Sequence, residues 1–365
     1  MNVKTERNNK KKTTYLIGIV LIVLVVSMFY KFKNKDTHST SSYLEEEIAS
    51  SIEKVKKNQN LNTVSIGFMT DLHMNEQEEE LCLNNIKAFT DISNTGLLDF
   101  SVNGGDLYYG TWKNREEGKV NLKYVKLLFS NINIPMLYAR GNHDCNIKKD
   151  PDEAISNQDY YNIMLKHLEG EVTFNDKEPY GGYYYKDLEE QKIRVCILNA
   201  FNGENYQYIF GDTQLEFIAT NVLNFENKEN AEDWQVIFFT HTIESSITHP
   251  ESVEDKEKFY EILTAYKDAS VVEINNKKID YSKQGNGTVI AIISGHHHMD
   301  LSDNKNGIPI IMTTSASSTY SREYTYEEVV NTKNELAFDI LTIDSKKRTI
   351  NITRLGRGED REISY

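Results

Sequence analysis

Short apolar, β-branched runs alternate with longer amphipathic stretches from residue 63 to about residue 315 of the chain. Such runs are typical of buried strands, and apolar residues at helical spacing are typical of helices that pack on one face. The pattern therefore predicts strands interleaved with helices. The predicted strands are residues 64–69, 97–102, 135–139, 192–200, 234–240, 288–294 and 308–314. The predicted helices include residues 81–89, 122–129, 212–223 and 256–266.

The C-terminal part has two runs in which apolar and polar residues alternate. The runs AFDILTID and RTINITRL are separated only by residues 345–347, which predicts a β-hairpin. The final residues, GRGEDREISY, bring Arg354, Arg357 and Arg361 close together in sequence. Arginine grips phosphate with two parallel hydrogen bonds, so these side chains are candidates for substrate contact. A solvated tail of mixed charge is the favoured alternative.

The N-terminal part has a different composition. Residues 15–30 form an almost unbroken apolar run, YLIGIVLIVLVVSMFY, with five basic residues before it and three soon after it. This pattern predicts a transmembrane signal anchor with a cytoplasmic basic tail at residues 1–14 and everything from residue 31 outside the membrane. A cleaved signal peptide and a secreted protein are the alternative. Residues 31–60 are expected to form a polar stalk and a short helix, followed by a catalytic domain over residues 61–365.

Charge and composition exclude some functions. The 365 residues carry a formal charge of -14, which would repel a polyanionic backbone, so we expect no nucleic-acid scaffold role. The three cysteines, Cys82, Cys145 and Cys196, are too few and scattered for a disulfide framework and are expected to be packing residues. Two tyrosine-rich stretches, 145–185 and 320–326, are predicted either to form rims over a pocket or to lie at a solvated edge.

Polar residues with metal-binding side chains follow five of the predicted strands. They are Asp71, His73, Asp106, Asn142, His143, His241, His296 and His298. Because ligands collect beyond the carboxyl ends of strands in open α/β sheets, we expect these residues to converge. Gly105, Gly141 and Gly295 directly precede candidate ligands, at points where the chain must turn sharply or approach an ion closely.

The order of these motifs resembles that of the calcineurin-like metallophosphoesterases. The family's DxH, GD, GNH(D/E), single histidine and GHxH motifs correspond to residues 71–73, 105–106, 141–144, 241 and 295–298. The resemblance covers roughly residues 61–315. It implies an α+β fold with α/β/β/α layers, which is a two-sheet β-sandwich flanked by helices with the site on one edge.

The resemblance also implies a dinuclear site. Asp71, His73 and His298 would hold one metal, the second metal would be held by Asn142, His241 and His296, and Asp106 would bridge the two. In such a site a metal-bridging hydroxide attacks phosphorus in line while His143 assists the leaving group. The mixture of imidazole, carboxylate and amide ligands suits manganese, iron or zinc.

The sequence therefore predicts a membrane-anchored, metal-dependent hydrolase of phosphomonoesters or phosphodiesters. One alternative is a catalytically inert surface binding module on the same scaffold. Another is a metallo-β-lactamase-like hydrolase, because residues 296–300 also satisfy HxHxD, although Leu301 occupies the place of a further histidine. Tyr109 completes a GDxxY pattern like that of purple acid phosphatases, but we place it outside the metal shell because His73 takes that position. The stretch GGDLYYGTW lacks the extended signature of protein phosphatases.

Overall fold

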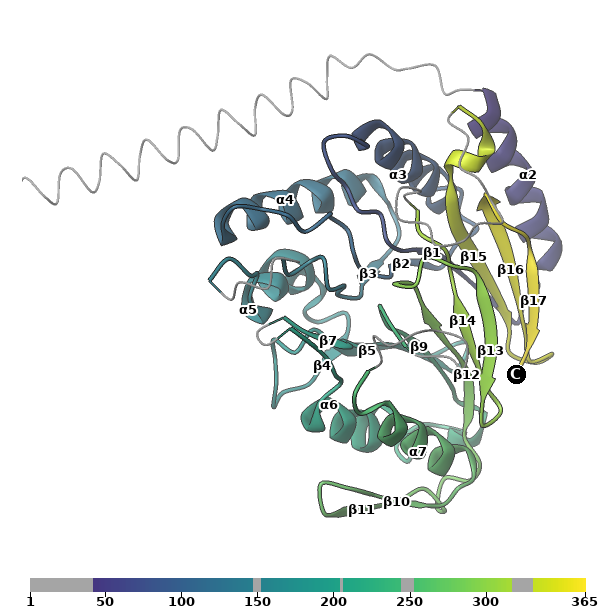
Figure 1. The fold of residues 1–365 in the computed structure, drawn as a ribbon. Coiled ribbons are helices and arrows are strands. Elements are labelled where there is room, and N and C mark those ends of the chain that lie inside the picture. The colour runs from purple at the N-terminus through teal and green to yellow at the C-terminus, as the bar shows by residue number, and fades with distance from the viewer. Residues whose placement is uncertain (1–41, 147–151, 204–205, 244–252, 317–330) are drawn as a thin grey trace, which may run out of the picture. The chain divides into compact units, whose positions relative to one another are not determined.

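Two mixed β-sheets pack face to face between two layers of helices in the computed structural model (Figure 1). The structure describes residues 42–146, 152–203, 206–243, 253–316 and 331–365. The sheets and their covering helices belong to one compact unit, residues 46–365. The predicted α/β/β/α sandwich is confirmed.

The first sheet has six strands in the order β17-β16-β15-β1-β2-β3. The strands are β1 (Thr63–Met69), β2 (Phe100–Asn103), β3 (Met136–Tyr138), β15 (Ala337–Asp344), β16 (Thr349–Gly356) and β17 (Arg361–Ser364). Strands β1, β2 and β3 run parallel, whereas β15 to β17 continue the sheet in antiparallel pairs. The carboxyl ends of β1, β2 and β3 therefore lie at one edge of the sheet.

The second sheet has seven strands in the order β13-β14-β12-β9-β6-β5-β4. The strands are β4 (Thr173–Phe174), β5 (Tyr184–Leu188), β6 (Ile193–Ile197), β9 (Gln235–Phe239), β12 (Thr288–Ser294), β13 (Leu301–Lys305) and β14 (Ile308–Met312). Its four central strands, β6, β9, β12 and β14, are parallel. Phe68 of β1 and Phe239 of β9 meet between the sheets with ring centroids 5.6 Å apart.

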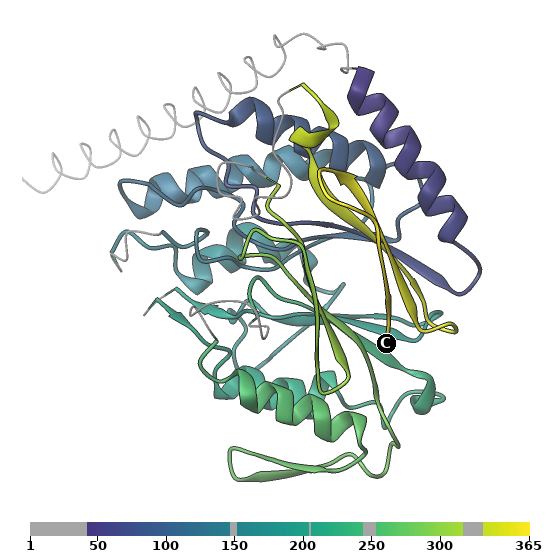
Figure 2. The ribbon, with the colours of Figure 1, turned by 45° about the vertical axis from the view of Figure 1, so that its right-hand side comes forward.

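Amphipathic helices cover the outer faces of the two sheets (Figures 1 and 2). Helices α3 (Glu79–Ser93) and α4 (Arg115–Leu128) lie over the first sheet, and α6 (Asp212–Phe217) and α7 (Lys256–Lys267) lie over the second. Helix α4 begins where the Asn114 side chain accepts a hydrogen bond from the Glu117 amide at 3.0 Å, which satisfies one otherwise unpaired amide of the first turn. Helix α6 continues as a π-helical segment over Ile218–Val222, so the two together span the predicted helix.

The remaining elements are helix α2 and several short segments. Helix α2 (Ser42–Asn58) covers the predicted juxtamembrane helix, and Val55 on it is buried. Helix α5 (Asn157–Tyr160) continues into a π-helix and a 3-10 turn that end at Leu168. Two strand pairs are also present, β7 (Phe201–Asn202) with β8 (Gln207–Tyr208) and β10 (Val271–Ile274) with β11 (Lys277–Asp280). Three 3-10 turns, Phe129–Asn131, Ala231–Asp233 and Lys333–Glu335, complete the described elements.

Several tyrosines of the stretch 145–185 are core residues. The Tyr160 hydroxyl is buried and donates to the Ala139 carbonyl at 2.9 Å. The Tyr184 hydroxyl accepts from the Tyr138 amide at 2.9 Å and donates to the Tyr138 carbonyl at 3.1 Å. Both predicted alternatives, a pocket rim and a solvated edge, are therefore wrong for these two residues, because both side chains are buried in the core and their hydroxyls satisfy backbone groups there. Residues 320–326 lie outside the described part of the chain.

Two further expectations concern the ends of the chain. The solvated C-terminal tail is wrong, because β17 pairs with β16 and the Arg354 and Arg357 side chains are buried. The predicted transmembrane anchor, residues 15–30, and the basic tail before it lie outside the described residues. Within the ranges that are described, no helix has the length and apolar character needed to cross a membrane. The three cysteines are buried and unpaired with one another, as expected for packing residues.

Candidate metal centre

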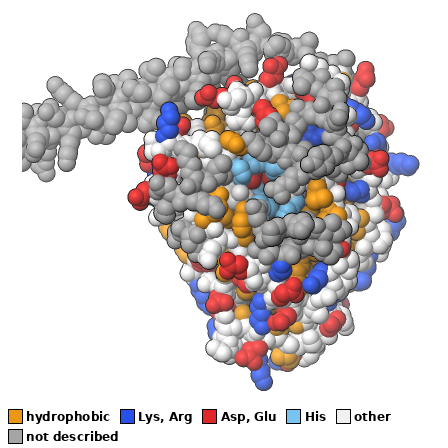
Figure 3. All heavy atoms as spheres, in the orientation of Figure 1, with side chains coloured by type: hydrophobic (Ala, Val, Ile, Leu, Met, Phe, Trp, Pro, Cys, Tyr) orange, Lys and Arg blue, Asp and Glu red, His pale blue; other side chains and the backbone are white. Residues whose placement is uncertain are grey.

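The predicted site residues come together where the carboxyl ends of β1, β2 and β3 face those of β9 and β12. All seven predicted metal ligands are buried, namely Asp71, His73, Asp106, Asn142, His241, His296 and His298. Figure 3 shows histidine side chains gathered in the middle of one face of the molecule. The predicted convergence is therefore present in the structure.

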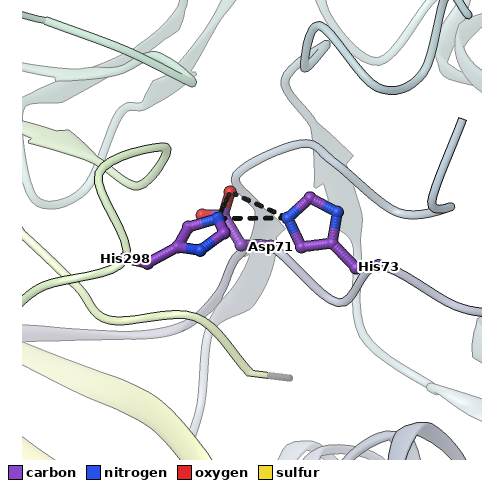
Figure 4. A group of neighbouring side chains, drawn as sticks. All are labelled: Asp71, His73 and His298. Carbon is purple, nitrogen blue, oxygen red and sulfur yellow. Dashed lines mark hydrogen bonds and ion pairs between the residues drawn. The ribbon is translucent and has the colours of Figure 1, made fainter. Parts of the chain in front are cut away.

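Asp71, His73 and His298 form the first cluster (Figure 4). The Nε2 atom of His298 lies 3.2 Å from Asp71 Oδ1 and 3.1 Å from His73 Nε2. His73 Nε2 also lies 3.7 Å from Asp71 Oδ1. Three donor atoms thus surround one point, and two of them are ring nitrogens that face each other. This arrangement fits a divalent metal ion held by imidazole and carboxylate groups.

Asp106, Asn142, His241 and His296 form the second cluster. His241 Nε2 lies 3.3 Å from Asp106 Oδ2, 3.1 Å from Asn142 Oδ1 and 3.2 Å from His296 Nδ1. The Nδ1 of His241 donates to the Gly104 carbonyl at 2.9 Å, which leaves Nε2 facing the cluster. A hydrogen bond of this kind at the far ring nitrogen orients a metal-ligating histidine and fixes its tautomer.

A single carboxylate oxygen lies between the two clusters. Asp106 Oδ2 is 3.3 Å from His241 Nε2 in the second cluster and 3.7 Å from His73 Nε2 in the first. The other oxygen, Oδ1, accepts a hydrogen bond from the His143 amide at 2.8 Å, which fixes the carboxylate plane. The His and Asp side chains of the two clusters therefore suit a pair of metal ions sharing one carboxylate.

The loops that carry the ligands adopt an unusual backbone conformation. Five candidate ligands have positive φ angles: Asp71 (54°), His73 (46°), Asp106 (54°), His296 (66°) and His298 (53°). A non-glycine residue in this region costs about 1–3 kcal/mol, and such residues cluster at functional sites where the surrounding structure holds them. The strain is consistent with loops shaped for binding.

Glycines allow these loops to approach one another closely. A Cβ atom at Gly295 would lie 2.2 Å from Asp71 Oδ2, and one at Gly141 would lie 2.1 Å from Asp106 Oδ1. Neither position can accept a side chain without moving a ligand carboxylate. The role predicted for these two glycines, close approach next to a ligand, agrees with the structure.

Asp144 ties two of the ligand loops together. Its Oδ2 accepts from the amides of Asp106 and Gly141 at 3.1 and 2.9 Å, and its Oδ1 accepts from the Leu107 amide at 2.9 Å. Asp144 lies inside a recognised motif, but its part in joining the loops was not predicted. Thr70, which donates to Asp71 Oδ2 at 2.6 Å, was also missed, since a threonine at the end of a strand carries no distinctive signal.

His143 lies beside the clusters and remains partly open to solvent. Its Nδ1 donates to the Tyr109 carbonyl at 2.6 Å, so its Nε2 faces Asp106 Oδ2 at 4.0 Å. The side chain of His143 is 19% exposed, unlike the candidate ligands. The His143 side chain can therefore be reached in part from solvent. Tyr109 contributes its backbone carbonyl here.

The electrostatics of the metal-free site favour charged carboxylates. Burial raises the pKa of Asp71 and of Asp106, but the histidines around them outweigh it and hold each pKa well below its ordinary value. Burial lowers the pKa of His73 to about 3, so this ring is neutral and can bind a metal directly. Burial also opposes the charge on His241, but Asp106 outweighs it and raises the pKa of His241 to about 10. A metal would replace the proton that neutralises this pair.

The family model for calcineurin-like phosphoesterases matches residues 64–300. The chain belongs to the calcineurin-like phosphoesterases. A dimetal phosphatase from Danio rerio shares the fold, with 12% sequence identity, a TM-score of 0.59, and coverage of 83% of this chain and 99% of that chain. The anchor protein of the inner membrane complex of Plasmodium is also similar, with 12% identity, a TM-score of 0.46, and coverage of 83% and 88%. No curated protein sequence matches this chain.

Membership of this family does not support the metallo-β-lactamase alternative. It agrees with buried clusters of His and Asp that can bind metal. Which residue holds which ion stays a prediction.

Tyr208 was not selected from the sequence, although its ring centroid lies 5.3 Å from that of His296. It comes from the short strand β8, which has no clear sequence pattern.

Proposed function

We propose that this phosphoesterase uses two metal ions to hydrolyse phosphomonoesters or phosphodiesters. Asp71, His73 and His298 hold the first ion. Asn142, His241 and His296 hold the second, and Asp106 bridges them. The observation that carries the proposal is the position of Asp106 Oδ2 between His73 Nε2 and His241 Nε2, at 3.7 and 3.3 Å.

The bound ions supply Lewis acidity and activate a water molecule for attack on phosphorus. The P–O bond to the leaving group then breaks, and the leaving oxygen needs a proton. His143 supplies it from Nε2, because Nδ1 is already committed to the Tyr109 carbonyl at 2.6 Å. The partial exposure of His143 allows an ester oxygen to reach Nε2 while the carboxylates remain shielded from water.

The donor chemistry favours manganese, iron or zinc over ions that require oxygen ligands alone. Four histidines contribute nitrogen donors to the two clusters, and imidazole suits these transition metals. Tyr109 stays outside the proposed metal shell, because His73 takes the coordination place that the tyrosine has in purple acid phosphatases. The Tyr109 carbonyl orients His143. A ferric-tyrosinate chromophore is therefore not expected.

We also propose that residues 15–30 anchor the protein in a membrane and that the catalytic domain lies outside it. The apolar run and the excess of basic residues before it support this placement. The alternative is secretion after cleavage of the segment. An external phosphoesterase would scavenge phosphate or trim phosphodiesters of the cell envelope.

The direct test is hydrolysis by the purified full-length protein of one monoester and one diester chromogen, with Mn²⁺, Zn²⁺ and Fe²⁺ supplied in turn. We expect metal-dependent turnover of at least one substrate, and its loss in Asp106→Ala. Asp91→Ala is the matched control, because Asp91 is an exposed helical carboxylate that pairs only with Lys87 among the described residues. Absence of hydrolysis with every metal would favour the inert binding module.

A further inference from the structure

Two buried arginines connect the C-terminal hairpin to loops of the metal centre. Arg354 is on β16, and Arg357 follows that strand directly. Both lie beyond residues 64–300, the part of the chain that the family model matches. Both guanidinium groups are within the protein, with each residue only 2% exposed. Burying a charged group is costly unless it is well paired, so the partners of these arginines indicate what they hold in place.

Arg354 acts on the loop that carries His298. It donates through Nη1 to Asp300 Oδ2 at 2.6 Å and through Nη2 to Asp300 Oδ1 at 2.5 Å. Its Nε donates to Asp339 of β15 at 2.8 Å, which anchors the guanidinium in the sheet. Asp300 lies two residues after His298 and also accepts from the Thr314 amide at 3.1 Å. The Thr314 hydroxyl in turn donates to the His298 carbonyl at 3.2 Å.

Arg357 acts on the loop that carries Asp71. Its Nη2 donates to the Ser315 carbonyl, and its own amide donates to the Leu336 carbonyl at 2.9 Å. The Ser315 hydroxyl donates to the Asp71 carbonyl at 2.9 Å. The amide of the next residue, Ala316, donates to the carbonyl of Thr70 at 3.0 Å. The segment that Arg357 fixes therefore holds the backbone of Asp71, which has a positive φ.

Both chains of contacts end at the first cluster. Asp71 and His298 belong to it. In the second cluster His241 is oriented from elsewhere, by its bond to the Gly104 carbonyl. His296 is linked to the first cluster, because its amide donates to Asp71 Oδ2 at 2.9 Å. We propose that Arg354 and Arg357 are positioning residues that set the affinity of the Asp71, His73 and His298 site for its metal. The inference rests on the proposed function, because it presupposes that this cluster binds a metal.

The size of the effect follows from the geometry. A planar guanidinium that bonds two carboxylates at once cannot be replaced by a flexible or neutral side chain with the same contacts. Loss of groups that orient metal ligands typically lowers metal affinity about 10–100-fold. We therefore expect Arg354→Gln to weaken the first site by that factor and to weaken the second site less, because only His296 of its ligands is on the same loop as His298.

Single-site backgrounds separate the two clusters. His241→Ala removes a ligand of the second site and keeps all ligands of the first. His298→Ala removes a ligand of the first site and keeps all ligands of the second. Arg354→Gln is introduced into each background of the full-length protein, and Mn²⁺ binding is measured by equilibrium dialysis. We expect a larger loss of Mn²⁺ affinity in the His241→Ala background than in the His298→Ala background. This readout does not depend on turnover.

A matched control distinguishes positioning from general destabilisation. Arg194 is equally buried and donates to Asp187 through Nε at 2.6 Å and Nη2 at 2.8 Å, but it lies on β6, whose carboxyl end carries no predicted ligand. Among the described residues, its other hydrogen bonds reach backbone carbonyls of residues 221, 222 and 224. Arg194→Gln should lower stability without a selective loss of the first metal.

A second variant covers the case in which Arg354→Gln does not fold. Asp300→Ala removes the partner near His298 but keeps the Arg354 pair with Asp339, and we expect the same selective loss. Unchanged Mn²⁺ binding by either folded variant in the His241→Ala background would overturn the inference, as would an equal loss in Arg194→Gln. If the parent protein binds no Mn²⁺, Zn²⁺ or Fe²⁺, the proposed function is overturned, and the inference with it.

Discussion

The carbonyl of Tyr109 lies 2.6 Å from Nδ1 of His143 and accepts a hydrogen bond from it. This contact orients the imidazole so that Nε2 is directed toward Asp106 at 4.0 Å, at the opening of the two clusters. A ring held in this way can give a proton to a leaving oxygen without first reorienting.

Replacing His143 should slow chemistry while leaving the metals in place. For His143→Gln we expect kcat to fall about 10²–10⁴-fold on an alkyl phosphate ester, the range typical for loss of a general acid. The fall should be smaller on a nitrophenyl ester, whose leaving group departs without a proton. Steady-state kinetics on both esters, with metal analysis of the same samples, measures this. Equal losses on the two esters would contradict the role of His143 as a proton donor.

Adding one methyl group at Gly295 should disturb the first cluster. In Gly295→Ala the new Cβ would lie 2.1 Å from Thr70 Oγ1 and 2.2 Å from Asp71 Oδ2. Such overpacking costs about 1–3 kcal/mol in the free energy of unfolding, and here it also displaces a ligand. We expect weaker metal binding and lower activity, measured by urea unfolding in chelator and by metal titration.

Gly170→Ala provides the control for that experiment. Gly170 has a φ of 85°, and a Cβ atom added there would have no neighbour within 4 Å, so only backbone strain is added. This variant should lose about 1–2 kcal/mol of stability and keep its metal affinity. If Gly295→Ala binds metal as tightly as Gly170→Ala does, close packing of that glycine against Asp71 is not needed for the site.

Acid should destabilise the fold through Asp339. Burial raises the pKa of this carboxyl, but Arg354 and Arg361 outweigh it and lower the pKa below its ordinary value. The unfolded chain therefore binds the proton more readily than the folded protein. The stabilisation is fully present above the unfolded pKa of about 3.9 and is lost as the pH falls toward the folded value.

Asp339→Asn should remove most of this pH dependence. It should also lower the free energy of unfolding by about 3–5 kcal/mol near neutral pH, because it leaves Arg354 buried with a weaker partner. Urea unfolding of both proteins in chelator, from neutral pH down to about pH 3 where Asp protonates, measures the difference. Parallel stability curves for the two proteins would contradict the assignment to Asp339.

Strands with continuous or alternating apolar runs were predicted well from the sequence. Residues 288–294 and the alternating run 337–344 match β12 and β15 in full. Strands β13 and β17 were missed, since each lies at a sheet edge and consists largely of polar residues. Backbone pairing stabilises such strands, and side-chain periodicity does not reveal it.

The residues of the candidate site were predicted from the sequence, but the contacts that support them were not. Its convergence follows from the parallel strands that end in ligands, a rule that needs only strand order. The pair between Arg354 and Asp300 could not be predicted, because 54 positions separate the residues. Arg354 lies in no recognisable motif, and Asp300 is only the last residue of the HxHxD pattern at residues 296–300, which does not point to an arginine partner. The arginines were expected in a solvated tail or at the substrate, and the structure instead pairs Arg354 and Arg361 with buried Asp339.

Metal analysis of the purified protein tests the central claim most directly. After loading with Mn²⁺ and removal of free metal, the wild-type chain should retain two ions, His298→Ala and His241→Ala should each retain about one, and Asp106→Ala should lose affinity at both sites, as expected for a shared ligand between paired metals. One ion in the wild type, or full occupancy in all three variants, would contradict a dinuclear centre built on these residues.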